Sequence, residues 1–231
     1  YIDDFKKPSP NLVPVIYFAD HFSEKSVDQK FVPLAGISNK ETIFCKEDGP
    51  LIRYKSDRYG FNNNDSIWLE KNIFAITIGD SFTHGACVER KNTIANNIDS
   101  KKYVLNLGIG GTGPLIQYAI LREYLNKINP EKIIWIYYEE NDLSDLIYEL
   151  SNSTLREYLI KKNFSQDLIS QQKKIDKKLI DVLHLAIINK NKKQTKDIID
   201  FIKLKKLRTL IIDRTSQNET KISKEFVEIM K

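Results

Sequence analysis

The chain has 231 residues, of which 41% are hydrophobic, and a formal net charge of +5. At about 150 residues per domain this length predicts one full domain with an appendage, and the apolar content is enough for a sizeable core, which excludes a disordered chain and a miniprotein. The charge is uneven, because residues 151–231 hold 19 basic and 10 acidic side chains, whereas every glycine lies at or before Gly113. We therefore expect two unlike parts, with the chemistry in the glycine-bearing one.

Residues 1–70 are predicted to form an irregular, β-containing lead-in. Prolines interrupt short extended stretches there, such as residues 13–18 and 41–45. Residues 54–63 carry turn-forming residue types throughout, and we expect their aromatic side chains to hold a loop on the core rather than to bind a ligand.

Residues 71–150 alternate between strand and helix patterns. Continuous apolar runs, which suit parallel strands covered by helices, occur at residues 72–79, 102–108 and 132–139. Helical spacing occurs between them, at residues 92–99 and 114–127. This order predicts an α/β core with an open, mostly parallel sheet.

Residues 151–231 are predicted to be a helical insertion that continues into further core elements, with helices at 153–162, 165–189 and 195–212. Their lysines are interpreted as a solvated face rather than a nucleic-acid surface, since no aromatic residues or reading motif accompany them.

The longest apolar run, residues 133–138, is far below the ~18 residues that span a bilayer. Cys45 and Cys87 fit no metal or redox spacing and cannot form a disulfide framework.

Unusual sequence follows each predicted strand. In an open parallel sheet, ligands bind beyond the carboxyl ends of the strands, so these loops are the place for a site. The loops read Gly79-Asp80-Ser81, residues 108–113 (GIGGTG) and Asn141-Asp142.

Together the three loops resemble the conserved blocks of the GDSL-type hydrolases of the SGNH superfamily. The resemblance implies a three-layer α/β/α, flavodoxin-like fold with Ser81 as nucleophile. It also implies an oxyanion hole with donors from the backbone N–H of Gly111, with Gly110 as the alternative, and from the side chain of Asn141. Glu139 departs from the family pattern, which usually has glycine there.

The residue types fit acyl transfer on physical grounds as well. A serine just past a strand end holds its Oγ at the crevice, glycines let bare backbone approach the same point, and an asparagine amide is a neutral donor. Such donors are worth roughly 3–4 kcal/mol each to the transition state when one is removed. Taken singly, each piece has a plainer interpretation as a turn or a helix cap, with Asp80 ordering its turn.

A dinucleotide-binding protein is an alternative from another class. Gly108, Gly110 and Gly113 satisfy G-x-G-x-x-G after a strand and before a helix, and Glu139 or Glu140 follows at the end of the next strand. That hypothesis leaves the loops at Ser81 and Asn141 unexplained.

The general base is the missing element. The family supplies it from a late Asp-x-x-His, which Asp181 and His184 spell here, but within a long helical pattern. His84 lies three residues beyond Ser81 and is predicted to be a wall of the site or a substrate contact, and His21 has no supporting pattern.

We expect that the chain ends before a fourth strand and the true Asp-x-x-His, an expectation that a natural stop at Lys231 would overturn. The rival is a catalytically silent relative that keeps the pocket as a binding module. The sequence thus predicts an esterase, deacetylase or acyltransferase that acts on a small-molecule or carbohydrate ester with no metal or organic cofactor and no nucleic-acid partner. Oligomeric state and compartment are left open, with the cell envelope or periplasm expected if an N-terminal anchor precedes the chain.

Overall fold

The computed structural model describes residues 12–17, 30–45 and 51–193, with side chains up to residue 185. The chain divides into two compact units, Tyr1–Leu179 and Ile180–Lys231. The sheets and the candidate site described below all belong to the first unit.

A small parallel sheet forms the core of the first unit. Its strands, in the spatial order β5-β4-β6, are β4 (Ala75–Gly79), β5 (Val104–Asn106) and β6 (Lys132–Ile136). The central strand β4 is buried at every residue, as an apolar run with a neighbour on each side requires. The sheet confirms the three predicted parallel strands and the α/β class.

The register brings the carboxyl ends of the three strands to one edge. Ala75 pairs with both Val104 and Lys132, and Gly79 pairs with Ile136 at the other end of β4. The loops that follow the strands therefore begin beside one another.

Short helices connect these strands: α2 (Ser81–His84), η3 (Arg90–Asn92), α3 (Ile94–Ile98), α4 (Pro114–Tyr124) and η4 (Leu125–Lys127). Thr93 caps α3, because its hydroxyl accepts from the backbone N–H of Asn96, and α4 begins at Pro114, which suits a first helical position. Ala95 of α3 packs against Ala75 and Val104 of the sheet. The helices predicted at 92–99 and 114–127 are thus confirmed.

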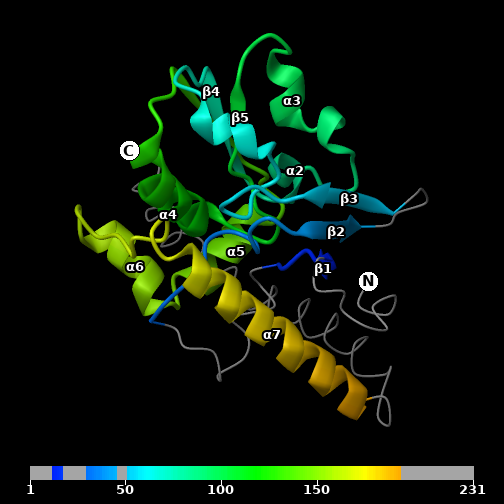
Figure 1. The fold of residues 1–231 in the computed structure, drawn as a ribbon. Helices are drawn as coiled ribbons and strands as arrows, with labels where there is room; N and C mark the ends of the chain where they lie inside the picture. The colour runs from blue at the N-terminus through cyan, green and yellow to red at the C-terminus, as the bar shows by residue number, and fades with distance from the viewer. Residues whose placement is uncertain (1–11, 18–29, 46–50, 194–231) are drawn as a thin grey trace. The chain divides into compact units, whose positions relative to one another are not determined.

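A second, mixed sheet belongs to the lead-in. It consists of β1 (Leu12–Pro14), β2 (Glu41–Cys45) and β3 (Ile52–Lys55), and the short helix η2 (Asp65–Leu69) follows. The strand β1 runs parallel to β2, which pairs antiparallel with β3, as Figure 1 shows. A disulfide joins Cys45 at the end of β2 to Cys87 beyond α2, so the two cysteines form a single crosslink between the lead-in and the core.

The helices that follow the sheet are α5 (Asp142–Glu149), α6 (Ser153–Ile160) and α7 (Gln172–Lys193). The sequence did not predict α5 as a separate helix, and α7 begins later than residue 165. The reason for the later start is Glu123, whose buried carboxylate accepts from the backbone N–H groups of Gln166 and Leu168 and holds them in turns. The helix predicted at 195–212 lies outside the described residues.

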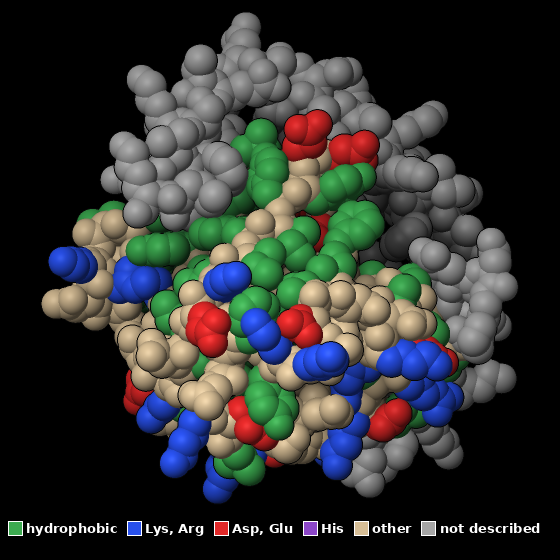
Figure 2. Space-filling view, turned by 90° about the horizontal axis from the view of Figure 1, so that it is seen from above, with side chains coloured by type: hydrophobic (Ala, Val, Ile, Leu, Met, Phe, Trp, Pro, Cys, Tyr) green, Lys and Arg blue, Asp and Glu red, His purple; other side chains and the backbone are tan. Residues whose placement is uncertain are grey.

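The surface carries mixed charge. On the face shown in Figure 2, hydrophobic side chains gather in a band, and Lys and Arg side chains alternate with acidic ones beside it rather than forming one block. Within the described part of the chain, every helix is too short or too polar to cross a membrane.

Candidate functional site

Ser81 begins the short helix α2 directly after the central strand. Asp80 is the residue before the helix, and its Oδ1 accepts from the backbone N–H of Phe82 at 3.0 Å. Asp80 is buried, Ser81 is half-buried and Phe82 is exposed. The carboxylate of Asp80 therefore fixes the turn, as the sequence predicted, while Ser81 stays half-buried at the start of α2.

The glycine loop after β5 approaches Ser81 closely. A β carbon placed on Gly110 would lie 3.6 Å from Cβ of Ser81, an ordinary van der Waals contact, and 2.6 Å from Cε1 of Tyr17, so the ring of Tyr17 would have to shift. The next residue, Gly111, has φ of 72°, a left-handed conformation that glycine adopts at little cost. Bare backbone thus lies beside the candidate nucleophile.

Asn106 and Asn63 hold this glycine loop in place. The Nδ2 of Asn106 donates to the backbone oxygen of Thr83 at 2.8 Å, and its Oδ1 accepts from the N–H of Gly108 at 2.8 Å. The side chain of Asn63 in turn pairs with both backbone groups of Asn106, at 2.9 Å each. These bonds are buried, so they fix the loop after β5 against α2.

The third loop reaches the first through Asn141. Its Nδ2 donates to Oδ2 of Asp80 at 3.3 Å, and its Oδ1 is buried and has no hydrogen-bond partner. Asp142 shapes the same loop, because its carboxylate accepts from the backbone N–H of Tyr138 at 2.7 Å and from Nε2 of Gln117 at 3.4 Å. Burial, with the nearby Asp80 as a further cause, raises the pKa of Asp142 to about 7.

The structure therefore brings Ser81, Gly110 and Asn141 into one neighbourhood at the carboxyl edge of the sheet. The backbone N–H of Gly110 donates to Nδ1 of His84 at 3.1 Å, so it is already engaged. Of the two glycines considered for the oxyanion hole, this favours Gly111, which stays the predicted donor.

His84 was predicted to be a wall of the site or a substrate contact, and in the structure it is a buried residue with hydrogen bonds at both ring nitrogens. It is only 1% exposed, and both ring nitrogens are engaged, with Nε2 lying 2.7 Å from the hydroxyl of Tyr54. Burial lowers the pKa of His84 to about 3, so the ring is neutral at physiological pH. Because Nδ1 accepts from Gly110, the proton sits on Nε2 and is donated to Tyr54.

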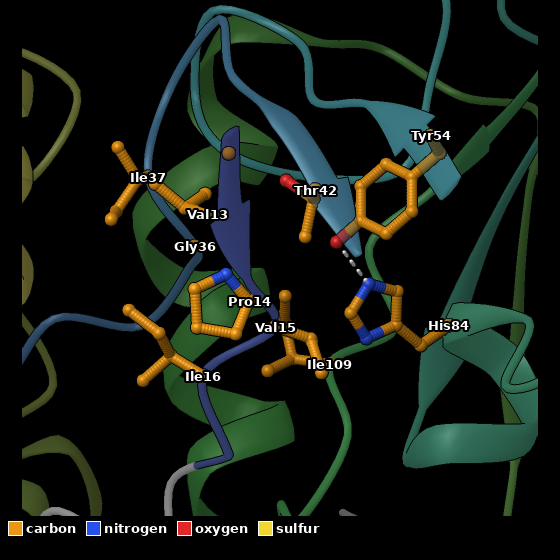
Figure 3. A pocket seen from close by; sticks show the side chains of 11 residues that line it. Val13, Pro14, Val15, Ile16, Gly36, Ile37, Thr42, Tyr54, His84 and Ile109 are labelled. Carbon is orange, nitrogen blue, oxygen red and sulfur yellow. Dashed lines mark hydrogen bonds between the residues drawn. The ribbon is translucent and has the colours of Figure 1, made fainter. Parts of the chain in front are cut away.

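A small pocket adjoins this histidine. Figure 3 shows the bond between Tyr54 and His84 at one wall of the pocket, while apolar side chains such as Ile37 and Ile109 form the rest. The pocket has room for about one water molecule, which is too little for an ester substrate.

The chain has two further histidines, His21 and His184. Asp181 and His184 lie on α7, where both side chains are exposed and belong to the second unit, and His21 lies outside the described residues. Across residues 12–17, 30–45 and 51–193, no cluster of three or more His, Cys, Asp or Glu side chains is placed to hold a metal ion.

Glu149 is an important residue that sequence reasoning missed. Its buried carboxylate accepts from the backbone N–H groups of Gly113, Leu115 and Ile116, at 2.5, 2.9 and 3.3 Å. These are the amides at the start of α4 that a dinucleotide pyrophosphate would need. The carboxylate fills that position from within the protein, which weighs against the dinucleotide hypothesis.

Burial raises the pKa of Glu149 to about 8, although the three amide donors oppose the shift. The folded protein therefore keeps a proton here that the unfolded chain loses near its ordinary pKa of 4.5. The contribution of Glu149 to stability should then be fully present below about pH 4.5 and fall by a few kcal/mol as the pH rises toward about 8, whereas the lowered pKa of His84 should reduce stability as the pH falls below about 6.5. Asp142 adds to the trend of Glu149 up to about pH 7.

Chemical denaturation at pH 5, 7 and 8 measures this effect. In Glu149→Gln the loss of stability between pH 7 and 8 should shrink, whereas the exposed control Glu131→Gln should follow the wild type. An identical pH profile in Glu149→Gln would show that Glu149 does not hold this proton.

The loop predicted to be pinned by its aromatic residues is indeed held on the core. The rings of Phe61 and Tyr124 pack edge to face at 5.0 Å between centroids, and Tyr59 packs on Trp68 at 4.6 Å. The buried carboxylate of Asp57 organises the same loop by accepting from four donors, the backbone N–H groups of Tyr59 and Phe61 and the side chains of Asn63 and Trp68. Sequence gave no signal for this role of Asp57.

No protein-family model, curated protein or solved structure matches this chain.

Proposed function

We propose that the chain is a serine-dependent ester hydrolase or acyltransferase of the SGNH type, with the three-layer, flavodoxin-like arrangement of that superfamily. The observation that carries the proposal is the convergence of three loops at one sheet edge, where Gly110 lies against Ser81 and Asn141 bonds to Asp80. Because parallel strands bring the loops that follow them to one edge in any case, the support lies in these two contacts.

In this proposal, Oγ of Ser81 attacks the ester carbonyl and the alcohol leaves, which forms an acyl-enzyme that water then hydrolyses. The backbone N–H groups of Ser81 and Gly111 and one N–H of the Asn141 amide stabilise the oxyanion. Asp80 orients that amide by accepting its other N–H. The hydrogen bonds of Asn106 and Asp142 fix the loops before substrate arrives, so little reorganisation is needed during the reaction.

The base that takes the proton of Ser81 comes from outside the site as described, since His84 is buried, neutral and engaged at both nitrogens. This observation also favours the second candidate, a catalytically silent binding module that keeps the SGNH-like crevice. In that case Ser81 would have no enhanced reactivity.

Labelling with a fluorophosphonate distinguishes the two. An activated serine displaces fluoride and forms a stable phosphonyl ester, so mass spectrometry should find one adduct, on the peptide that contains Ser81. Ser66, an exposed serine of η2, is the internal control and should stay unlabelled. A folded protein that takes no label at Ser81, or that takes as much at Ser66, would contradict the enzyme proposal and favour the binding module.

A further inference from the structure

An aromatic pair lies immediately beside the candidate nucleophile. Phe82 follows Ser81 in α2 and is 54% exposed, although the next residues of the helix, Thr83 and His84, are buried. The ring of Phe82 packs on that of Tyr138 at 4.8 Å between centroids, with the planes tilted by 60°. The pair thus joins the first loop of the site to the third and presents apolar surface to solvent, which favours contact with an apolar ligand.

Negative charge borders this aromatic pair. The hydroxyl of Tyr138 donates to the carboxylate of Glu140 at 2.5 Å, and both Glu139 and Glu140 are exposed. Among the ion pairs of the described residues, none involves either glutamate. A ligand lying on the two rings therefore meets an uncompensated carboxylate that the tyrosine itself holds in place.

We propose that Phe82 and Tyr138 form the subsite for an uncharged, apolar acyl chain, and that Glu140 excludes chains with an anionic end. This inference rests on the proposed function and names the substrate class of the same site. Phe82 supplies the contact surface, whereas Tyr138 has two roles, contact through its ring and placement of Glu140 through its hydroxyl.

The first arm of the test measures kcat/KM for p-nitrophenyl butyrate relative to p-nitrophenyl acetate. Two additional methylenes on the rings should make the butyrate the better substrate, and Phe82→Ala should lower the butyrate-to-acetate ratio about fivefold to tenfold. The matched control is Tyr103→Ala, which removes an aromatic residue of similar exposure, 51%, at the opposite end of the parallel strands. An unchanged ratio in Phe82→Ala would overturn the subsite.

The second arm tests charge with mono-p-nitrophenyl succinate, which has as many acyl carbons as the butyrate but ends in a carboxylate. We expect the wild type to prefer the butyrate at least about tenfold at low salt, and high salt to reduce that preference. Glu140→Gln should reduce the preference for the butyrate over the succinate. Tyr138→Phe keeps the ring but removes the hydroxyl that bonds to the Glu140 carboxylate, and it should reduce that preference by a smaller factor. Equal use of the two esters by the wild type would overturn the exclusion of anions.

A third arm separates this inference from the proposed function. Ser81→Ala cannot form an acyl-enzyme, so calorimetry can measure its binding of the inert amides butyranilide and succinanilic acid. The neutral amide should bind about tenfold more tightly, and adding Glu140→Gln should remove that difference, whereas adding Phe82→Ala should weaken the binding of both amides. If the wild type hydrolyses no ester but this binding preference holds, the proposed function fails and the subsite stands. If hydrolysis occurs without any preference, the subsite fails and the proposed function stands.

Discussion

Under the proposed function, replacing Ser81 by alanine is expected to lower kcat for p-nitrophenyl acetate by about 10⁴-fold or more, as loss of the nucleophile does in serine hydrolases. The change removes one oxygen from a half-buried position at the start of a four-residue helix, so stability should change little. Steady-state kinetics on purified protein, with the unfolding midpoint measured in parallel, gives both results.

The matched control for this experiment is Ser66→Ala, which removes an exposed hydroxyl from η2 and should retain wild-type kinetics. Equal rates in Ser81→Ala and the wild type would remove the enzyme proposal, because any observed hydrolysis would then be independent of Ser81. A loss of rate accompanied by unfolding would instead point to damage, which the denaturation curve detects.

Replacing Asn141 by alanine is expected to lower kcat by about 100-fold to 1000-fold with KM nearly unchanged, since an oxyanion donor acts mainly in the transition state. The amide of Asn141 can supply one N–H to the oxyanion because its other N–H donates to Asp80 at 3.3 Å. Asn141→Asp should be equally impaired, because a carboxylate cannot donate and would face the carboxylate of Asp80.

Asn97→Ala is the control for a lost asparagine, since this exposed side chain bonds only to backbone oxygens near α3. If Asn141→Ala keeps the wild-type kcat while Ser81→Ala is inactive, then Asn141 does not stabilise the oxyanion and backbone N–H groups alone do so. An increase in KM without loss of kcat would instead make Asn141 a residue for ground-state binding.

The parallel sheet could be predicted because its signal is local. The strand β4 lies in a largely apolar run, and its burial on both faces accounts for that pattern. The order of the strands along the chain shows which residues follow each strand end. The sequence could therefore predict that Ser81 and Asn141 lie near one another.

The contacts that hold the site loops in place could not be predicted from the sequence, because they join residues far apart in the chain. Glu149 bonds to the N–H of Gly113 across 36 residues, and Asn63 pairs with Asn106 across 43. The partners of His84 are of the same kind. Its place in the first turn of α2 predicted a wall of the site or a substrate contact, and the contact with the glycine loop that buries it is not visible in the sequence. Helix periodicity carries no information about such partners.

The disulfide between Cys45 and Cys87 closes a covalent ring with a sequence separation of 42, and Ser81 lies inside that ring. In the chain-entropy model, a closed loop of this length lowers the entropy of the unfolded chain by an amount worth about 4 kcal/mol, comparable to the whole stability of a marginal domain. The redox state of the surroundings therefore sets how many arrangements the unfolded chain can adopt. An oxidising compartment would make the segment that carries the nucleophile easier to refold after each local opening.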